Sequence, residues 1–157
     1  MEKNKASIIV LSGDFDKVFA AFILASGAAA AGMETTMFFT FWGLNAVSKG
    51  NKTGSSFMGK MIGRMNRGGL DRLNPSKFSF GGIGKKIFRK MMKDKNVASL
   101  EDLRQACIDM DVHFLACGMS MDVMEITRED LIDEVEDVVG VAKAIKDASE
   151  SSIQYFI

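Results

Sequence analysis

The stretch ASIIVLSGDFDKVFAAFILASG, residues 6–27, decides the fold. Its first six residues form a continuous β-branched and apolar run, which is typical of a strand buried on both faces in a parallel sheet. Ser12, Gly13 and Asp14 end this run. Apolar residues then recur at helical spacing from Phe15 to Ile23, with Asp14 in the N-cap position. A strand followed at once by a helix predicts the first half of a βαβ unit.

The remaining chain repeats this alternation. Further strands are expected at 34–41, 111–117, 134–138 and 152–157, with helices at 118–124 and 140–149 and another that begins after Ser99. This order predicts an α/β fold of the flavodoxin-like or Rossmann-like three-layer type, with about five mostly parallel strands and helices on both faces. We expect the strand order 2-1-3-4-5. The length of 157 residues and 47% hydrophobic content predict one folded domain, 1–157.

An inserted segment at about 50–84, rich in Gly, Met and basic residues, interrupts the alternation. Between residues 49 and 93 the chain carries 12 of its 20 Lys and Arg and one acid, whereas residues 101–150 carry 14 of its 20 acids. Such segregation points to an anion, an acidic partner or a membrane surface, and a simple solvated face is the alternative. The balanced total charge argues against nucleic-acid binding.

Two basic elements lie in or next to the insertion. Phe57 to Met65 predict a Met-rich amphipathic helix with Lys60 and Arg64 on its polar side, which either packs on the core as a lid or docks on a partner or membrane. The run from Gly81 to Lys86, with Lys85 and Lys86 at its end, is either an anion site or a flexible turn into a solvated helix. It is neither a Walker loop nor a dinucleotide fingerprint.

Targeting signals and cysteine usage favour a cytoplasmic protein. The chain shows no signal-peptide pattern, and the apolar stretch 18–33 is shorter than the ~20 residues of a membrane-spanning helix. Two cysteines, Cys107 and Cys117, are too few for a disulfide framework.

Cys117 is the main candidate for chemistry. In the expected strand order, ligands bind between the first and third strands, which selects the loop at Ser12 to Asp14 and the loop that Cys117 opens. The N–H groups and dipole of the helix behind Cys117 favour a thiolate, although free cysteines are usually small buried hydrophobes. The candidate site therefore joins two loops: Cys117 with Gly118, Met119, Ser120, Met121 and Asp122, and the facing Ser12, Gly13 and Asp14.

Other reactive residues are less suitable. Cys107 shares the apolar face of its helix and is expected in the core. His113, the only histidine, lies four strand residues before Cys117, roughly 13 Å at ~3.3 Å per residue, too far to act as its base. We expect no metal site and no bound cofactor.

From Ile8 onward, the chain resembles the DsrE/DsrF/DsrH-like family, in particular its subgroup with a long basic Met- and Gly-rich insertion. The matching stretches are Ser12-Gly13-Asp14 with Asp16-Lys17, Phe38 to Leu44, Gly81 to Gly84, Met91-Met92, Ala116 to Met124 and Glu129 to Asp133. Glu125 in place of Gly and Gly118 in place of Gln depart from the family pattern. The resemblance implies a cytoplasmic sulfur carrier or sulfurtransferase, homo-oligomeric or in mixed complexes, that exchanges sulfur with rhodanese-like or TusA-like proteins.

The leading hypothesis is therefore a sulfurtransferase that holds sulfane sulfur as a persulfide on Cys117 and passes it to a partner thiol. A nucleotide- or flavin-linked oxidoreductase module is the first alternative, with Gly81 to Lys86 on the phosphates. The second is a non-catalytic docking subunit whose basic Met-rich helix binds an acidic partner or makes a peripheral contact with a membrane.

Overall fold

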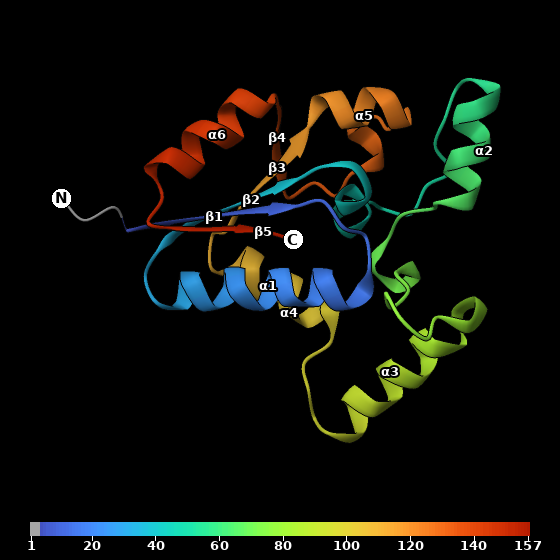
Figure 1. The fold of residues 1–157 in the computed structure, drawn as a ribbon, viewed down its shortest axis with the longest axis horizontal. Coiled ribbons are helices and arrows are strands. Elements are labelled where there is room, and N and C mark those ends of the chain that lie inside the picture. The colour runs from blue at the N-terminus through green and yellow to red at the C-terminus, as the bar shows by residue number, and fades with distance from the viewer. Residues whose placement is uncertain (1–3) are drawn as a thin grey trace.

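The computed structural model describes residues 4–157 and shows a five-stranded, fully parallel sheet with helices on both faces (Figure 1). This confirms the α/β class. The strands are β1 (Lys5–Val10), β2 (Glu34–Phe39), β3 (His113–Cys117), β4 (Val135–Val139) and β5 (Ile153–Phe156).

The strand order is β4-β3-β2-β1-β5, so the predicted order 2-1-3-4-5 is wrong. From β1 to β4, each strand lies next to the one before it in the chain, on the same side. Only β5 lies on the other side of β1. In the predicted order, β2 would be an edge strand. Met37, Phe38 and Phe39 of β2 are all buried, however, on both faces of the sheet. A strand without a solvent-facing side fits the interior of a sheet, between β1 and β3.

Two helices cover each face of the sheet. On one face lie α1 (Phe15–Ala30) and α4 (Leu100–Asp109), and on the other α5 (Gly118–Met124) and α6 (Val141–Glu150) (Figure 1). As expected, Gly32, with φ 79°, follows the end of α1, and Ser99 caps α4 in a reciprocal capping box with Asp102.

The core is divided unequally between the two faces. Under α1, the rings of Phe22, Phe39 and Phe114 pack with centroids 5.4 to 6.3 Å apart and are completely buried. On the opposite face the buried cluster is small, and Ala144 is the only buried residue of α6. The α6 face therefore keeps apolar side chains accessible.

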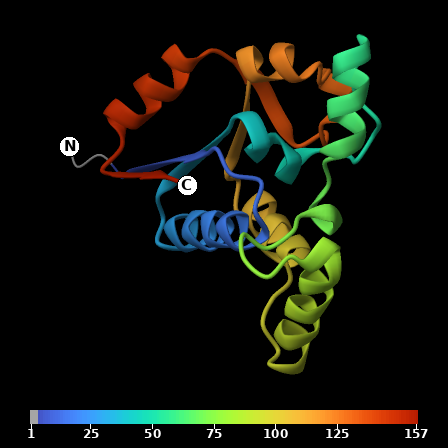
Figure 2. The same cartoon turned by 45° about the vertical axis from the view of Figure 1, so that its right-hand side comes forward.

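The inserted segment lies beyond the carboxyl ends of the strands. It contains α2 (Phe57–Met65), and α3 (Ile83–Asp94) follows; both stand clear of the sheet, as Figure 2 shows. Short 3-10 turns connect the elements: η1 (Phe41–Val47), η2 (Leu70–Arg72), η3 (Phe80–Gly82) and η4 (Arg128–Asp130). The exact limits of the insertion, about 50–84, stay a prediction.

The α2 helix packs through its glycines rather than through its methionines. Gly59 and Gly63 are buried, and a Cβ at either position would collide with Glu125 or Thr53. Phe57 and Met65 on the opposite side are 84% and 82% exposed. The interpretation of the Met-rich face as a lid packed on the core is therefore wrong, because the glycines allow a closer backbone approach than the larger side chains.

Candidate functional site

Cys117 is the last residue of β3 and the N-cap of α5, with an extended backbone (φ −77°, ψ 112°). Its side chain belongs to the small cluster under α6, together with Phe38, Leu115 and Ala144, and Cys117 is only 6% exposed. Gly118 behind it is held tightly, since a Cβ there would lie 3.3 Å from Cγ1 of Val138. The apolar strand and this close packing fix the thiol at the carboxyl edge of the sheet.

Hydroxyl and amide groups surround the Cys117 sulfur. Oγ1 of Thr40, just after β2, lies 2.7 Å from Oγ of Ser120 in α5. Burial raises the pKa of the Cys117 thiol, but hydrogen bonds from the side chains of Ser120 and Thr40 and from the backbone N–H groups of Ser120 and Met119 outweigh burial, so the pKa is lowered overall. This environment favours a nucleophilic thiolate.

Cys107 has the opposite environment. It is completely buried in α4, and its Sγ donates a weak hydrogen bond to the carbonyl oxygen of Phe22 at 3.5 Å. Burial raises the pKa of this thiol to about 12. Both cysteines are free, and the expectation that Cys107 is a core residue is confirmed.

The loop at Ser12, Gly13 and Asp14 does not face the Cys117 loop as predicted, because β2 lies between β1 and β3. Asp14 holds the N-cap position of α1, but its side chain makes no capping hydrogen bond and instead pairs with Lys17 at 3.0 Å. The neighbour that sequence reasoning missed is Thr40. Its place near the carboxyl end of the expected strand 34–41 would have indicated it, had the strand order been known.

The predicted site loop divides into two sides. Ser120 and Met121 point into the protein, with 1% and 5% exposure, whereas Met119 is 64% exposed and Asp122 is also exposed. Gly118 is intermediate. The exposed Met119 therefore lies on the surface next to the buried sulfur.

The four predicted basic residues have different surroundings. Lys60 and Arg64 on α2 line an open recess of about 660 Å³ together with Lys52, Phe57 and the neighbouring methionines. On α3, the Nζ of Lys85 donates to the carbonyl oxygen of Asp71 at 2.8 Å, and Lys86 is exposed. The structure thus places the two pairs on separate helices (Figure 2).

A carboxylate that sequence reasoning noted only as a departure from the family pattern joins α5 to α2. Glu125, in the left-handed conformation at the end of α5, accepts hydrogen bonds from the N–H groups of Ser55 and Ser56 at 2.5 and 2.8 Å and from both hydroxyls. These bonds, led by that from the Ser56 hydroxyl, lower the pKa of Glu125 to about 2. We call this arrangement the Glu125 clamp.

Residues 4–157 contain neither a cluster of metal ligands nor a helix that could span a membrane. His113 pairs with Glu136 at 2.8 Å, and no group of three or more His, Cys, Asp or Glu in this range could hold a metal ion. No helix in the same range is long and apolar enough to cross a membrane.

Comparisons with known proteins point to one family. A model of the DsrE/DsrF/DrsH-like family matches residues 2–156. The uncharacterized protein YrkE of Bacillus subtilis is 39% identical over 158 residues, 99% of this chain and 98% of that protein. The sulfur carrier protein DsrE2 of Allochromatium vinosum is 35% identical over the full length of both. The ychN protein of E. coli has the same fold, with a TM-score of 0.54 and 12% identity over 98% of this chain and 99% of that chain.

Proposed function

Because the chain belongs to the DsrE/DsrF/DrsH-like family, we propose that it is a sulfurtransferase that carries sulfane sulfur as a persulfide on Cys117. The family and the relative that is a sulfur carrier support a role in sulfur transfer in general. The observation that carries the finer proposal is the environment of Cys117, whose pKa is lowered by hydrogen bonds from Ser120, from Thr40 and from the backbone of Met119, against the effect of burial.

The proposed reaction is two successive thiol exchanges. The Cys117 thiolate attacks the outer sulfur of a donor persulfide, a new S–S bond forms at Cys117, and the donor leaves as its thiolate. A partner thiolate then attacks the outer sulfur, and the Cys117 thiolate leaves. No net oxidation occurs, so one cysteine suffices, and Cys107 with its raised pKa takes no part.

The proposed partners are rhodanese-like or TusA-like sulfur proteins in the cytoplasm and further copies of the same chain. The apolar side chains that α6 leaves exposed, Val141 and Ile145 among them, support self-association. The recess of Lys52, Lys60 and Arg64 supports an acidic docking partner, and the exposed Phe57 next to these bases supports peripheral membrane contact as a second use of the same surface.

The test is the mass of the intact protein after incubation with polysulfide, for wild type, Cys117→Ser and the matched control Cys107→Ala. Wild type and Cys107→Ala are expected to gain sulfur that a reductant removes, whereas Cys117→Ser gains none. Circular dichroism checks that each variant is folded. Loading on Cys107, or on neither cysteine, would contradict the proposal and favour a docking subunit without sulfur chemistry.

A further inference from the structure

A second cavity lies away from Cys117, at the carboxyl ends of β1 and β5. In the observed order β4-β3-β2-β1-β5, α1 leaves β1 over one face of the sheet and α6 enters β5 over the other. The strand order therefore reverses between β1 and β5, the position where open parallel sheets bind ligands. An open crevice of about 1040 Å³ occupies this position, and Cys117 does not line it.

The walls of this crevice are fixed by contacts between distant segments. A Cβ at Gly13 would lie 2.6 Å from the carbonyl oxygen of Trp42. Only glycine therefore lets the loop that follows β1 (residues 12–14, the β1 loop) approach η1 this closely. On the other side, Asn45 and Asn66 exchange side-chain hydrogen bonds of 2.8 and 3.3 Å, which attach the end of α2 to η1. Asn45 is 6% exposed. The crevice is thus formed before any ligand arrives.

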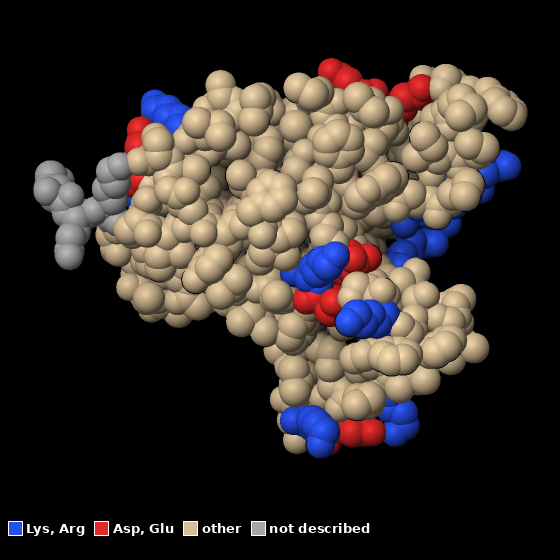
Figure 3. Space-filling model, viewed as in Figure 1, with Lys and Arg blue, Asp and Glu red and all other residues tan. Residues whose placement is uncertain are grey.

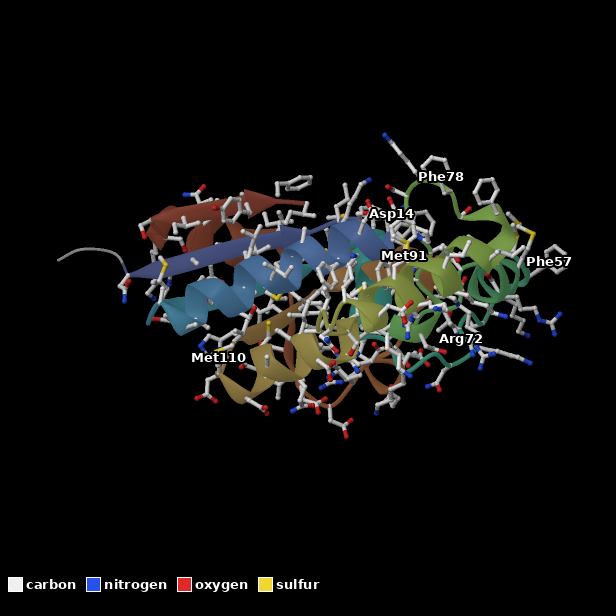
Figure 4. The ribbon with its side chains drawn as sticks, turned by 90° about the horizontal axis from the view of Figure 1, so that it is seen from below. Asp14, Phe57, Arg72, Phe78, Met91 and Met110 are labelled. Carbon is white, nitrogen blue, oxygen red and sulfur yellow. The ribbon has the colours of Figure 1, made fainter. Side chains whose placement is uncertain are left out.

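The crevice carries surplus positive charge. Its lining includes Lys17, Arg67 and Arg72 and a single acid, Asp14, which pairs with Lys17. The Nε of Arg67 donates to the carbonyl oxygen of Gly50 at 2.6 Å, which orients its guanidinium group. Arg72 makes no side-chain hydrogen bond or ion pair within residues 4–157. Figure 4 shows Asp14 and Arg72 at the end of the molecule where the strands stop.

An apolar surface lies next to these guanidinium groups. The indole of Trp42 is 47% exposed, and Met61 and Met65 of α2 line the crevice opposite the β1 loop. Guanidinium groups match the geometry of phosphate oxygens, and an indole face stacks on flat aromatic rings. The volume is at the upper end of the range for small-molecule sites.

We propose that this crevice binds a nucleotide, with its phosphate at Arg67 and Arg72 and its aromatic base against Trp42. The segment from Gly81 to Lys86, which the sequence suggested for phosphates, does not line the crevice. The proposal is independent of the persulfide on Cys117.

The test is isothermal titration of the full chain with AMP, FMN, inorganic phosphate and adenosine. AMP or FMN is expected to bind more tightly than phosphate or adenosine alone. Whichever of AMP and FMN has the higher affinity identifies the aromatic ring system that the crevice prefers. Trp42 is the only tryptophan, so its fluorescence gives a second readout at the site itself.

The decisive variant is Arg72→Glu, because the side chain of Arg72 has no hydrogen-bond or ion-pair partner among residues 4–157 whose loss would disturb the fold. It is expected to weaken nucleotide binding by about tenfold or more. The matched control, Lys95→Glu, makes the same charge change at an exposed residue outside the crevice and is expected to leave the affinity within about twofold. Absence of binding at millimolar AMP and FMN, equal binding of phosphate alone, or equal losses in the two variants would overturn the proposal. Sulfur loading of Cys117, measured on the same samples, separates this outcome from failure of the sulfurtransferase proposal.

Discussion

Two residues of the same type have opposite chemistry in this chain because of their neighbours. Cys107 is enclosed by apolar side chains in α4, and its pKa rises to about 12. Cys117 is also nearly buried, yet hydroxyl and N–H groups at the ends of β2 and β3 lower its pKa. Burial alone therefore does not decide whether a thiol is reactive; the hydrogen-bond donors within reach of the sulfur do.

Removing one of these donors is expected to raise the pKa of Cys117. Thr40→Val and Ser120→Ala each remove a hydroxyl that stabilises the thiolate, so alkylation of Cys117 by iodoacetamide at pH 7 is expected to be roughly threefold to tenfold slower. The curve of alkylation rate against pH should shift as a whole to higher pH in both variants. Ser26→Ala, which removes a hydroxyl from α1 far from the site, is the control. Unchanged rates in both variants would show that other groups set the reactivity.

At the scale of elements, the sequence predicts local structure better than contacts. The ranges of α2 and α5 agree with the sequence prediction to the residue, since helical periodicity and capping are local signals. Which side of α2 is buried does not follow from the local sequence pattern. The hydrophobic pattern indicates the Met face, but Gly59 and Gly63 let the opposite side approach Glu125, which is about 65 residues further along the chain.

The Glu125 clamp is expected to hold α2 in place. Glu125→Gln keeps the size of the side chain but removes the charge that accepts four hydrogen bonds from Ser55 and Ser56. Trypsin is therefore expected to cut after Lys60 and Arg64 several-fold faster in this variant. Glu134→Gln, an equal change at an exposed position outside the clamp, should leave the cleavage rate unchanged, and equal rates in all three proteins would exclude the clamp.

The same clamp predicts a pH dependence. The pKa of Glu125 is lowered from 4.5 to about 2 in the folded chain. Its stabilising contribution is therefore complete above about pH 4.5 and is lost as the pH falls toward 2. Hydrogen exchange of the α2 amides, corrected for intrinsic rates, should increase over this range in wild type. In Glu125→Gln it should already be fast and vary little with pH; an identical profile in both proteins would contradict the assignment.

At the scale of the molecule, the strand order decides which loops meet, and the sequence does not encode it directly. The α/β class and the position of Cys117 at a strand end follow from the hydrophobic pattern. The order 4-3-2-1-5 brings Thr40 to Cys117 and moves Ser12 to Asp14 to a separate crevice. The burial of Met37, Phe38 and Phe39 depends on lateral neighbours, which strands far apart in the chain supply.

The whole molecule also has a face suited to association. Figure 3 shows a broad area over β5, α6 and α1 almost without charged side chains, and β5 is an edge strand with Tyr155 and Phe156 exposed. Ile23, Val141 and Ile145 are also exposed on these elements, and contiguous exposed apolar side chains mark interaction sites. The charged side chains gather instead at the rim and around the insertion (Figure 3).

Self-association through α6 is therefore expected in solution. Light scattering coupled to gel filtration should give a multiple of the 17.2 kDa chain mass for wild type. Ile145→Glu, which places a carboxylate at a residue that is 61% exposed in the monomer, should shift the protein toward monomers without unfolding it, because burial of an unpaired charge in an interface is costly. Glu136→Gln on β4 is the control, since β4 lies at the opposite edge of the sheet from β5. A monomeric wild type, or an oligomer that Ile145→Glu leaves intact, would place the interface elsewhere. In the first case the exposed face would be left for a sulfur-exchange partner of a different sequence.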